Sequence, residues 1–279
     1  MTQDGRTGEL LREVLERLDA RDERTGELVA AAVRHLHAFV LETGLTHEEW
    51  RAGIAFLTAV GQTCTETRQE FILLSDTLGV SSLVEMTSAG TSADATENTV
   101  LGPFYVPGSP ERAPGESIVE TDDPGPRALV TGIVRGVGGA PLAGAVLDVW
   151  QNASNELYAV QDPGQPPTNL RGTLVTDEQG RFAFRTIRPV AYPVPADGPV
   201  GQLLAATGRH PWRPAHIHFM VTAPGYAPLI THVFDAASAY LDSDAVFGVR
   251  DSLVMRFDEG ERGELTASFD IVLDPSDGV

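Results

Sequence analysis

The chain changes character near residue 98, and this change constrains its fold more than any other feature. From residue 8 to about residue 90, apolar residues recur every three to four positions, as in amphipathic helices. Beyond residue 98, proline and glycine become frequent, and short alternating segments are separated by turn residues. We therefore expect a helical N-terminal region, residues 1–98, joined to a mainly β domain, residues 99–279.

Four helices are expected in the first region. Apolar stripes over residues 10–18 and 28–40 indicate two of them, and Gly44 would end the second. Residues 46–49, Thr-His-Glu-Glu, have the form of a capping box that opens a third helix. Residues 69–78 predict a fourth. The histidines of this region are expected to be surface or capping residues without a metal role: His35, His37 and His47.

The second region should be an antiparallel β-sandwich, because its predicted strands are short and follow one another through turns. The expected strands are residues 128–134, 146–150, 181–187, 216–222, 229–234, 253–257 and 267–272. Two connections, 152–169 and 189–211, are too long for hairpin loops. Long connections of this kind usually carry function.

Composition excludes several classes of protein. The formal charge of −19 argues against a nucleic-acid partner, because a polyanion would be repelled. The one cysteine, Cys64, can form neither an internal disulfide nor a thiolate cluster. No apolar run is long enough to cross a membrane, and the polar N-terminus has no signal core. The expected location is the cytoplasm.

A candidate metal site begins with two histidines on one predicted strand. His216 and His218 are separated by one residue, so their side chains lie on the same face of the strand. Imidazole is a common metal ligand. Each long connection upstream carries one tyrosine, Tyr158 and Tyr192, and the chain has only five. Taken alone, either tyrosine is better explained as a packed ring with a solvated hydroxyl than as a ligand.

The combination of two phenols and two imidazoles favours ferric ion. Tyrosine ionises only near pH 10, and a highly charged cation stabilises its phenolate by direct coordination. Fe(III) is hard enough to take two phenolates, and it also binds imidazole. Zinc more usually takes cysteine, histidine or carboxylate ligands. A rival arrangement uses three histidines, His216, His218 and His232, in an Fe(II) or Zn(II) hydrolase or oxygenase.

Three segments of the chain resemble the intradiol ring-cleavage dioxygenases of the catechol 1,2-dioxygenase type. They are VWQN with Tyr158 (149–158), RPVAYP (188–193) and RPAHIH (213–218). The resemblance extends over nearly the whole chain, including LGPFY at 101–105. It implies a non-haem Fe(III) enzyme that takes an aromatic diol or triol and O2. It also implies a homodimer formed through the helical region, which in this family can hold a lipid.

Within that family, the chain is most similar to the hydroxyquinol 1,2-dioxygenases. The segments that carry this similarity are QEFILLSDTLG at 69–79 and YLDSDAVFGV at 240–249. The implied reaction inserts both atoms of O2 into benzene-1,2,4-triol to give 3-hydroxy-cis,cis-muconate, the enol form of maleylacetate. Catechol and chlorocatechol 1,2-dioxygenase activities are the alternatives. A non-catalytic transthyretin-like sandwich is a third reading, which leaves the tyrosines and histidines without a purpose.

The resemblance assigns roles to individual residues. Tyr158, Tyr192, His216 and His218 would hold Fe(III), and Tyr192 would be the ligand that leaves when substrate binds. Arg213 would stabilise negative charge that develops on the ring. His232 would support the site from outside the ligand set.

The substrate pocket implied by the resemblance is mostly apolar, as a flat aromatic ring requires. Asp76 is the exception, and we expect it to accept a hydrogen bond from the third hydroxyl of hydroxyquinol. The expected lining residues are Leu73, Asp76, Val100, Leu101, Gly102, Pro103, Phe104, Val194, Pro195, Arg213 and Val246.

Overall fold

The computed structural model describes residues 3–65, 68–88, 92–260 and 263–276. The chain forms two compact units, Met1–Ala59 and Val60–Val279. The second unit contains the β domain together with two helices of the predicted helical region. The domain boundary near residue 98 stays a prediction.

The first three helices are α1 (Gln3–Glu16), α2 (Glu23–Thr43) and α3 (His47–Thr63). Gly44 ends α2 in the left-handed conformation, with φ of 61°. The capping box is confirmed, since the Glu49 amide donates to Thr46 Oγ1 at 3.2 Å and the Thr46 amide donates to Glu49 Oε2 at 2.8 Å. No helix of the described chain has the length and apolarity of a membrane-crossing segment.

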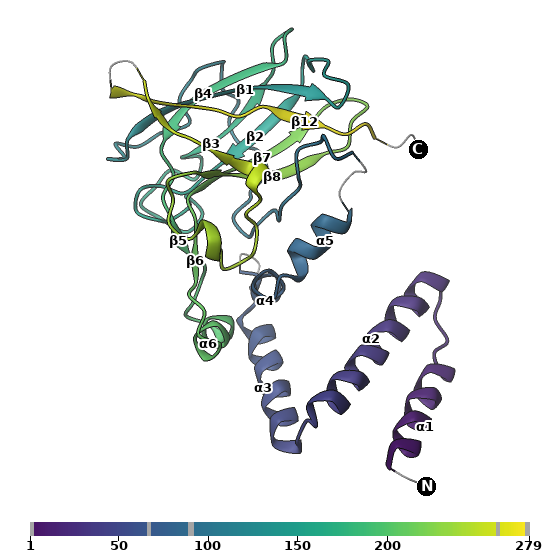
Figure 1. The fold of residues 1–279 in the computed structure, drawn as a ribbon. Helices are drawn as coiled ribbons and strands as arrows, with labels where there is room; N and C mark the ends of the chain where they lie inside the picture. The colour runs from purple at the N-terminus through teal and green to yellow at the C-terminus, as the bar shows by residue number, and fades with distance from the viewer. Residues whose placement is uncertain (1–2, 66–67, 89–91, 261–262, 277–279) are drawn as a thin grey trace. The chain divides into compact units, whose positions relative to one another are not determined.

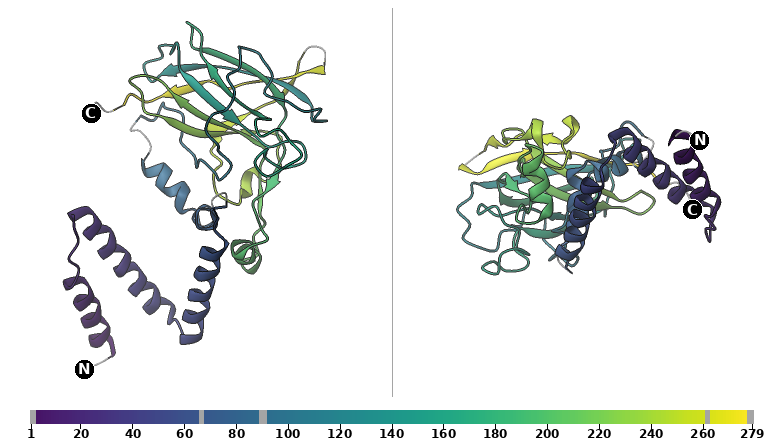
Figure 2. Two further views of the ribbon diagram at one scale, coloured as in Figure 1. Left: turned by 180° about the vertical axis from the view of Figure 1, so that it is seen from behind. Right: turned by 90° about the horizontal axis from the view of Figure 1, so that it is seen from below.

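The β domain consists of two stacked sheets (Figures 1 and 2). One sheet has the order β10-β11-β1-β12, with β4 paired to β1, and the other has the order β3-β2-β7-β8-β9. Its longer strands are β1 (Arg127–Gly136), β2 (Val146–Trp150), β3 (Arg171–Val175), β4 (Arg181–Ile187), β7 (His216–Thr222) and β8 (Leu229–Asp235). The short strands are β9 (Val254–Met255), β10 (Asp258–Glu259), β11 (Leu265–Ser268) and β12 (Ile271–Leu273).

One apolar core fills the space between the sheets. Val130 of β1 and Phe184 of β4 meet Ile217, Phe219 and Val221 of β7 there, and all five are shielded from solvent. Because side chains alternate along a strand, the other residues of β7 point to the outer face of their sheet. His216 and His218 are therefore directed away from the core.

The sheets differ from the predicted antiparallel sandwich in detail. Most pairs are antiparallel, but β1 pairs with β11 and β12 in parallel, and β8 pairs with β9 in parallel. The predicted strand 267–272 is divided between β11 and β12, which pair with β1 in the same register and are separated by residues 269–270. The predicted strand 253–257 ends at Met255, and β3 was not predicted because it follows a long connection without clear alternation.

Short helices and a small hairpin lie at one end of the β domain (Figure 1). They are α4 (Glu70–Thr77), α5 (Val80–Ser88), α6 (Pro199–Ala206) and the pair β5 (Tyr192–Pro193) and β6 (Trp212–Arg213). α6 lies inside the predicted connection 189–211 and starts with proline, which is favoured at the first helical position. Ser82 of α5 donates to the Val246 carbonyl at 3.0 Å, so this end is joined to the loop after β8.

Candidate metal centre

The histidines of β7 are as deeply buried as the core, although they face away from it. His216 and His218 each expose 1% of their surface. Connections on the outer face cover them: Phe104 stacks on Tyr158 with ring centroids 4.5 Å apart, and Trp150 stacks on His218 at 4.6 Å. Buried imidazoles need polar partners, so this arrangement calls for a ligand.

The tautomer of His216 is fixed by the backbone. Its Nδ1 lies 2.7 Å from the carbonyl oxygen of Pro214, which can only accept a hydrogen bond. Nδ1 therefore carries the proton, and the lone pair of Nε2 is free to bind a cation. Pro214 thus contributes to the site through its carbonyl group as well as by its place before the strand.

The two predicted tyrosines reach the histidines from different segments. Tyr158 follows β2, and its hydroxyl lies 3.0 Å from His218 Nε2. Tyr192 is the first residue of β5 and pairs across the hairpin with Arg213 of β6. The Tyr158 and Tyr192 rings meet edge to face with centroids 5.3 Å apart. Both tyrosines are 3% exposed, which excludes the solvated hydroxyls of the alternative interpretation.

Burial keeps His216, His218 and Tyr158 uncharged unless a cation is present. It lowers the pKa of His216 to about 3 with help from the Arg213 charge, and it lowers the pKa of His218 well below the usual range. Burial and the neighbouring Tyr192 raise the pKa of Tyr158 well above its ordinary value. The phenolate form of Tyr158 therefore requires a bound cation.

The donor atoms fit a single metal ion. His216 Nε2 and His218 Nε2 lie 3.2 Å apart, and His218 Nε2 and the Tyr158 hydroxyl lie 3.0 Å apart. Ligand atoms bound at about 2.1 Å to one ion are separated by about 3 Å. The two nitrogens and the phenol oxygen thus have the spacing of ligands to one metal, with two neutral imidazoles and phenols whose ionisation a trivalent cation would favour.

His232 lies beside the two histidines but directs its lone pair elsewhere. It is the cross-strand partner of His218 on β8, and one nitrogen from each of His216, His218 and His232 lies within 4.8 Å of the others. Its Nδ1 is 3.2 Å from Arg213 Nη2. Since arginine only donates, Nδ1 accepts this bond and the proton resides on Nε2. In this arrangement neither nitrogen of His232 is available to a metal.

Arg213 is a buried cation beside the tyrosine and histidine ligand candidates. Its Nη1 lies 3.5 Å from the Tyr192 hydroxyl and 3.5 Å from His216 Nε2. Burial acts to lower its pKa, but the charge and hydrogen bonds of Asp244 together with the neighbouring Tyr192 and Tyr158 outweigh that effect, and the pKa lies above its ordinary value. Burial likewise opposes ionisation of Asp244, and Arg213 holds the Asp244 pKa below its usual range. The two groups form a buried ion pair.

The predicted pocket residues fall into two sets. Five line a cavity of about 700 Å³: Leu73, Pro103, Phe104, Val194 and Pro195. Of the others, Leu101 packs against the cluster that contains the Tyr158 and Tyr192 rings, the Val246 amide donates to Asp244, and three lie beside a histidine or Arg213. A Cβ on Gly102 would lie 3.3 Å from His218 Cε1, and the Val100 carbonyl interacts with the His232 ring. Asp76 is 4% exposed and interacts electrostatically with Arg213.

Some residues at this site were not predicted from the sequence. The cavity is also lined by Tyr105, Val106, Leu157, Val160 and Gln161. Leu157, Val160 and Gln161 belong to the connection 152–169, so its length was the available signal. Asp244 gave no separate signal, because a carboxylate in an irregular loop is most often solvated.

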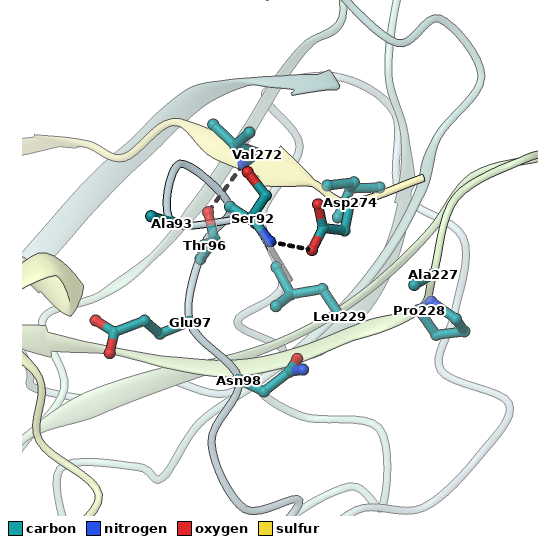
Figure 3. A pocket seen from close by; sticks show the side chains of 12 residues that line it. Ser92, Ala93, Thr96, Glu97, Asn98, Ala227, Pro228, Leu229, Val272 and Asp274 are labelled. Carbon is teal, nitrogen blue, oxygen red and sulfur yellow. Dashed lines mark hydrogen bonds between the residues drawn. The ribbon is translucent and has the colours of Figure 1, made fainter. Parts of the chain in front are cut away.

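A second hollow, of about 270 Å³, lies elsewhere in the β domain (Figure 3). Residues 92–98 border it together with the ends of β8 and β12. Hydrogen bonds close its sides: the Ser92 amide donates to Asp274 at 3.3 Å, and the Val272 amide donates to Thr96 Oγ1 at 2.9 Å. Its lining includes none of the candidate metal ligands, and we interpret it as the seam that attaches residues 92–98 to the sheets.

Two known protein families match most of the chain. Residues 100–275 match the family described as Dioxygenase, and residues 22–96 match the family described as Catechol dioxygenase N terminus.

Two relatives are 50% identical to the chain. The 6-chlorohydroxyquinol 1,2-dioxygenase of Cupriavidus pinatubonensis matches over 96% of this chain and 97% of the relative. The hydroxyquinol 1,2-dioxygenase of a Rhizobium species matches over 87% of this chain and 82% of the relative. The crystal structure of hydroxyquinol 1,2-dioxygenase from Pseudomonas putida DLL-E4 superimposes with a TM-score of 0.92 at 46% identity, over 98% of this chain and 100% of that one.

Proposed function

The chain belongs to the intradiol catechol dioxygenase family, and from this premise we propose that it is a hydroxyquinol 1,2-dioxygenase. The reaction inserts both atoms of O2 into benzene-1,2,4-triol and gives 3-hydroxy-cis,cis-muconate. Two similarities support this substrate: half of the 244 aligned residues are identical to those of a hydroxyquinol 1,2-dioxygenase, and the fold matches that of another.

Four side chains hold the ferric ion that this family uses: Tyr158, Tyr192, His216 and His218. The observation that carries this assignment is that, in a buried site, His218 Nε2 lies 3.0 Å from the Tyr158 oxygen and 3.2 Å from His216 Nε2. Bound there, ferric ion supplies a Lewis acid and a template for two adjacent hydroxyl groups. The three-histidine alternative is disfavoured, because Arg213 occupies the lone pair of His232 Nδ1.

The protein groups around the ion bind substrate and move a proton. Tyr192 lies on the two-residue strand β5, near the start of the connection 189–211, and its phenolate would leave the ion and accept a proton from a substrate hydroxyl at Oη. Arg213 Nη1 is 3.5 Å from that oxygen and remains to stabilise negative charge on the ring. Phe104, packed on Tyr158, keeps water from the phenolate.

Asp76 selects the triol. Its Oδ1 is buried and has no hydrogen-bond partner within the described chain, and burial raises the pKa of its carboxyl group. A substrate hydroxyl that donates to Oδ1 would satisfy this group, whereas catechol would leave it unpaired. The apolar walls formed by Leu73, Val100, Val194 and Val246 are buried and suit the faces of a flat ring.

The helical unit is proposed to form the homodimer interface. Large apolar side chains remain exposed on α2 and α3, including Leu36, Leu41, Trp50 and Ile54. A second copy, with or without a lipid between the copies, would remove them from water. Light scattering after size exclusion should therefore give twice the chain mass, and extraction with organic solvent followed by mass spectrometry would identify a lipid.

Oxygen uptake tests the function directly. With hydroxyquinol, catechol and chlorocatechols in parallel, kcat/KM should be highest for hydroxyquinol, by about 10-fold or more. The iron-loaded protein should be wine-red from tyrosinate-to-iron charge transfer, and the Tyr192→Phe variant should lose most activity. A colourless iron-loaded protein, together with full activity of that variant, would contradict the proposal.

A further inference from the structure

Asp244 forms an ion pair with Arg213 through Nε and Nη2, the two nitrogens other than the one next to the tyrosine and histidine ligands. Arg213 Nε donates to Asp244 Oδ1 at 3.0 Å, and Arg213 Nη2 donates to Oδ2 at 3.3 Å. Two parallel bonds between a guanidinium and a carboxylate fix the guanidinium plane as well as its distance. Both side chains are at least 95% buried, so water does not compete for these bonds.

This two-bond ion pair determines which nitrogen of Arg213 faces the metal ligands. Nε and Nη2 are held by Asp244, and Nη2 also donates to His232 Nδ1 at 3.2 Å. Only Nη1 remains, and it lies 3.5 Å from both the Tyr192 hydroxyl and His216 Nε2. A guanidinium that was free to rotate about its last bonds would not keep one amine at this position.

The carboxylate is itself held by its own loop. The Gly248 amide donates to Asp244 Oδ2 at 2.9 Å, and the Val246 amide donates to Oδ1 at 3.3 Å. The space around the pair is closed, since a Cβ on Gly248 would lie 3.0 Å from Arg213 Nη2 and 3.2 Å from Asp244 Oδ2. Glycine at position 248 thus leaves only enough room for the ion pair.

We propose that Asp244 is a positioning residue for the ring-cleavage reaction, which acts by aiming Arg213 Nη1 at the Tyr192 oxygen. It also neutralises the guanidinium, so that a permanent positive charge can lie beside a metal site without strong repulsion. The inference rests on the proposed function. That function assigns Tyr192 as the ligand that leaves and Arg213 as the group that stabilises the ring charge.

A purely structural role for Asp244 makes a different prediction. Because Asp244 also binds the Val246 amide, a purely structural role would act only through the pocket wall, and that effect would not depend on Arg213. A double-mutant cycle separates the two roles, since a residue that acts through Arg213 has no further effect once Arg213 is removed.

The experiment compares Asp244→Asn, Arg213→Ala and the double variant, with Asp242→Asn as the control. Asp242 is exposed on the same loop. With hydroxyquinol, Asp244→Asn should lower kcat by about 10²-fold while KM changes by less than about threefold. In the Arg213→Ala background the same substitution should change kcat by less than about twofold. The control should match the parent protein.

A spectroscopic signal tests the same coupling without turnover. In the iron-loaded protein, Asp244→Asn should shift the visible tyrosinate band, because Nη1 no longer lies against the Tyr192 oxygen, and it should cause no shift in the Arg213→Ala background. Gly248→Ala, which presses on Nη2 and removes no charge, provides a second variant and should shift the band in the same background-dependent way if Asp244→Asn does not fold.

The outcomes distinguish the two proposals. An equal loss of kcat from Asp244→Asn with and without Arg213, or a band shift that does not depend on Arg213, overturns the positioning role. Absence of oxygen uptake with every diol would refute the proposed function instead, and the band shift would still decide whether Asp244 aims Arg213 at Tyr192.

Discussion

Strands β1 and β7 lie inside their respective sheets, and the residues on their outward faces differ in how deeply they are buried. Both direct apolar residues into the shared core, Val130 from β1 and Phe219 from β7. The outward residues of β1, such as Thr131 and Arg135, are partly exposed, whereas His216 and His218 on the outward face of β7 are as buried as the core. The difference comes from the connections that cover β7.

The comparison shows that alternation along a strand specifies direction but not environment. An outward histidine on β1 would be solvated and would need no partner. On β7, the connections that carry Phe104, Tyr158 and Tyr192 remove solvent, so the imidazoles must be satisfied by other protein groups or by a metal. Burial of a polar face is therefore the structural signature of the site.

The largest expected effect comes from removing an outward residue of β7. His218→Ala should abolish the visible band, reduce bound iron and lower oxygen uptake by about 10⁴-fold, or about 5 kcal/mol in activation free energy. The matched change on β1, Arg135→Ala, should leave all three properties unchanged. Metal analysis and oxygen uptake check the pair, and retention of iron by His218→Ala would show that this histidine is not a ligand.

Truncating a residue on the inward face of either strand should destabilise the protein, because both faces contribute to one core. Phe219→Ala on β7 should lower the free energy of unfolding of the iron-free protein by about 3–5 kcal/mol through a cavity in the core. Val130→Ala on β1 should lower it by about 2 kcal/mol for the same reason. Urea unfolding followed by circular dichroism gives both values. A loss below about 1 kcal/mol for Phe219→Ala would contradict the shared core.

A smaller effect is expected from Asp76, which belongs to the cover of the outward face of β7. Asp76→Ala should lower the ratio of kcat/KM for hydroxyquinol over catechol by about 10-fold, because only the triol has a hydroxyl to donate to this carboxylate. Catechol serves as the internal control, and its kcat/KM should change by less than about threefold. An unchanged ratio would remove Asp76 from substrate selection.

The smallest expected effect is a pH dependence of stability. Burial, and to a lesser extent Asp244, raise the Asp76 pKa, while Ser81 and the Arg213 charge partly oppose this. A raised pKa means that the folded state binds more protons than the unfolded state above about pH 3.9, so the Asp76 contribution is present below that pH and is lost as the pH rises through the folded pKa.

Asp76→Asn removes this dependence. Relative to the parent, the iron-free variant should therefore become progressively more stable as the pH is raised from about 4 to 7. Thermal unfolding at several pH values measures this trend. A stability difference that is constant over the range would show that Asp76 does not titrate with a raised pKa in the folded protein.

Much of the fold was predictable because local chemistry specifies it. The strands Val146–Trp150, Arg181–Ile187 and His216–Thr222 were predicted with the bounds that the structure shows, since turn residues delimit them. The predicted strand 267–272 was divided, because its pairing with β1 is interrupted at residues 269–270, where the Ile133 amide donates to the Asp270 carboxylate, and alternation does not reveal such a break. α6 was missed because it is short and lies within an irregular connection.

The sequence by itself determined the identity of the donor groups and their direction. Two imidazoles separated by one residue on a strand must share a face, and two tyrosines in long connections were available to meet them. Only the tertiary structure decided that these connections fold over that face, that Arg213 sets the protonated ring nitrogen of His232, and that Asp244 holds Arg213. Those decisions depend on contacts between residues distant in the chain, and a local pattern contains no information about them.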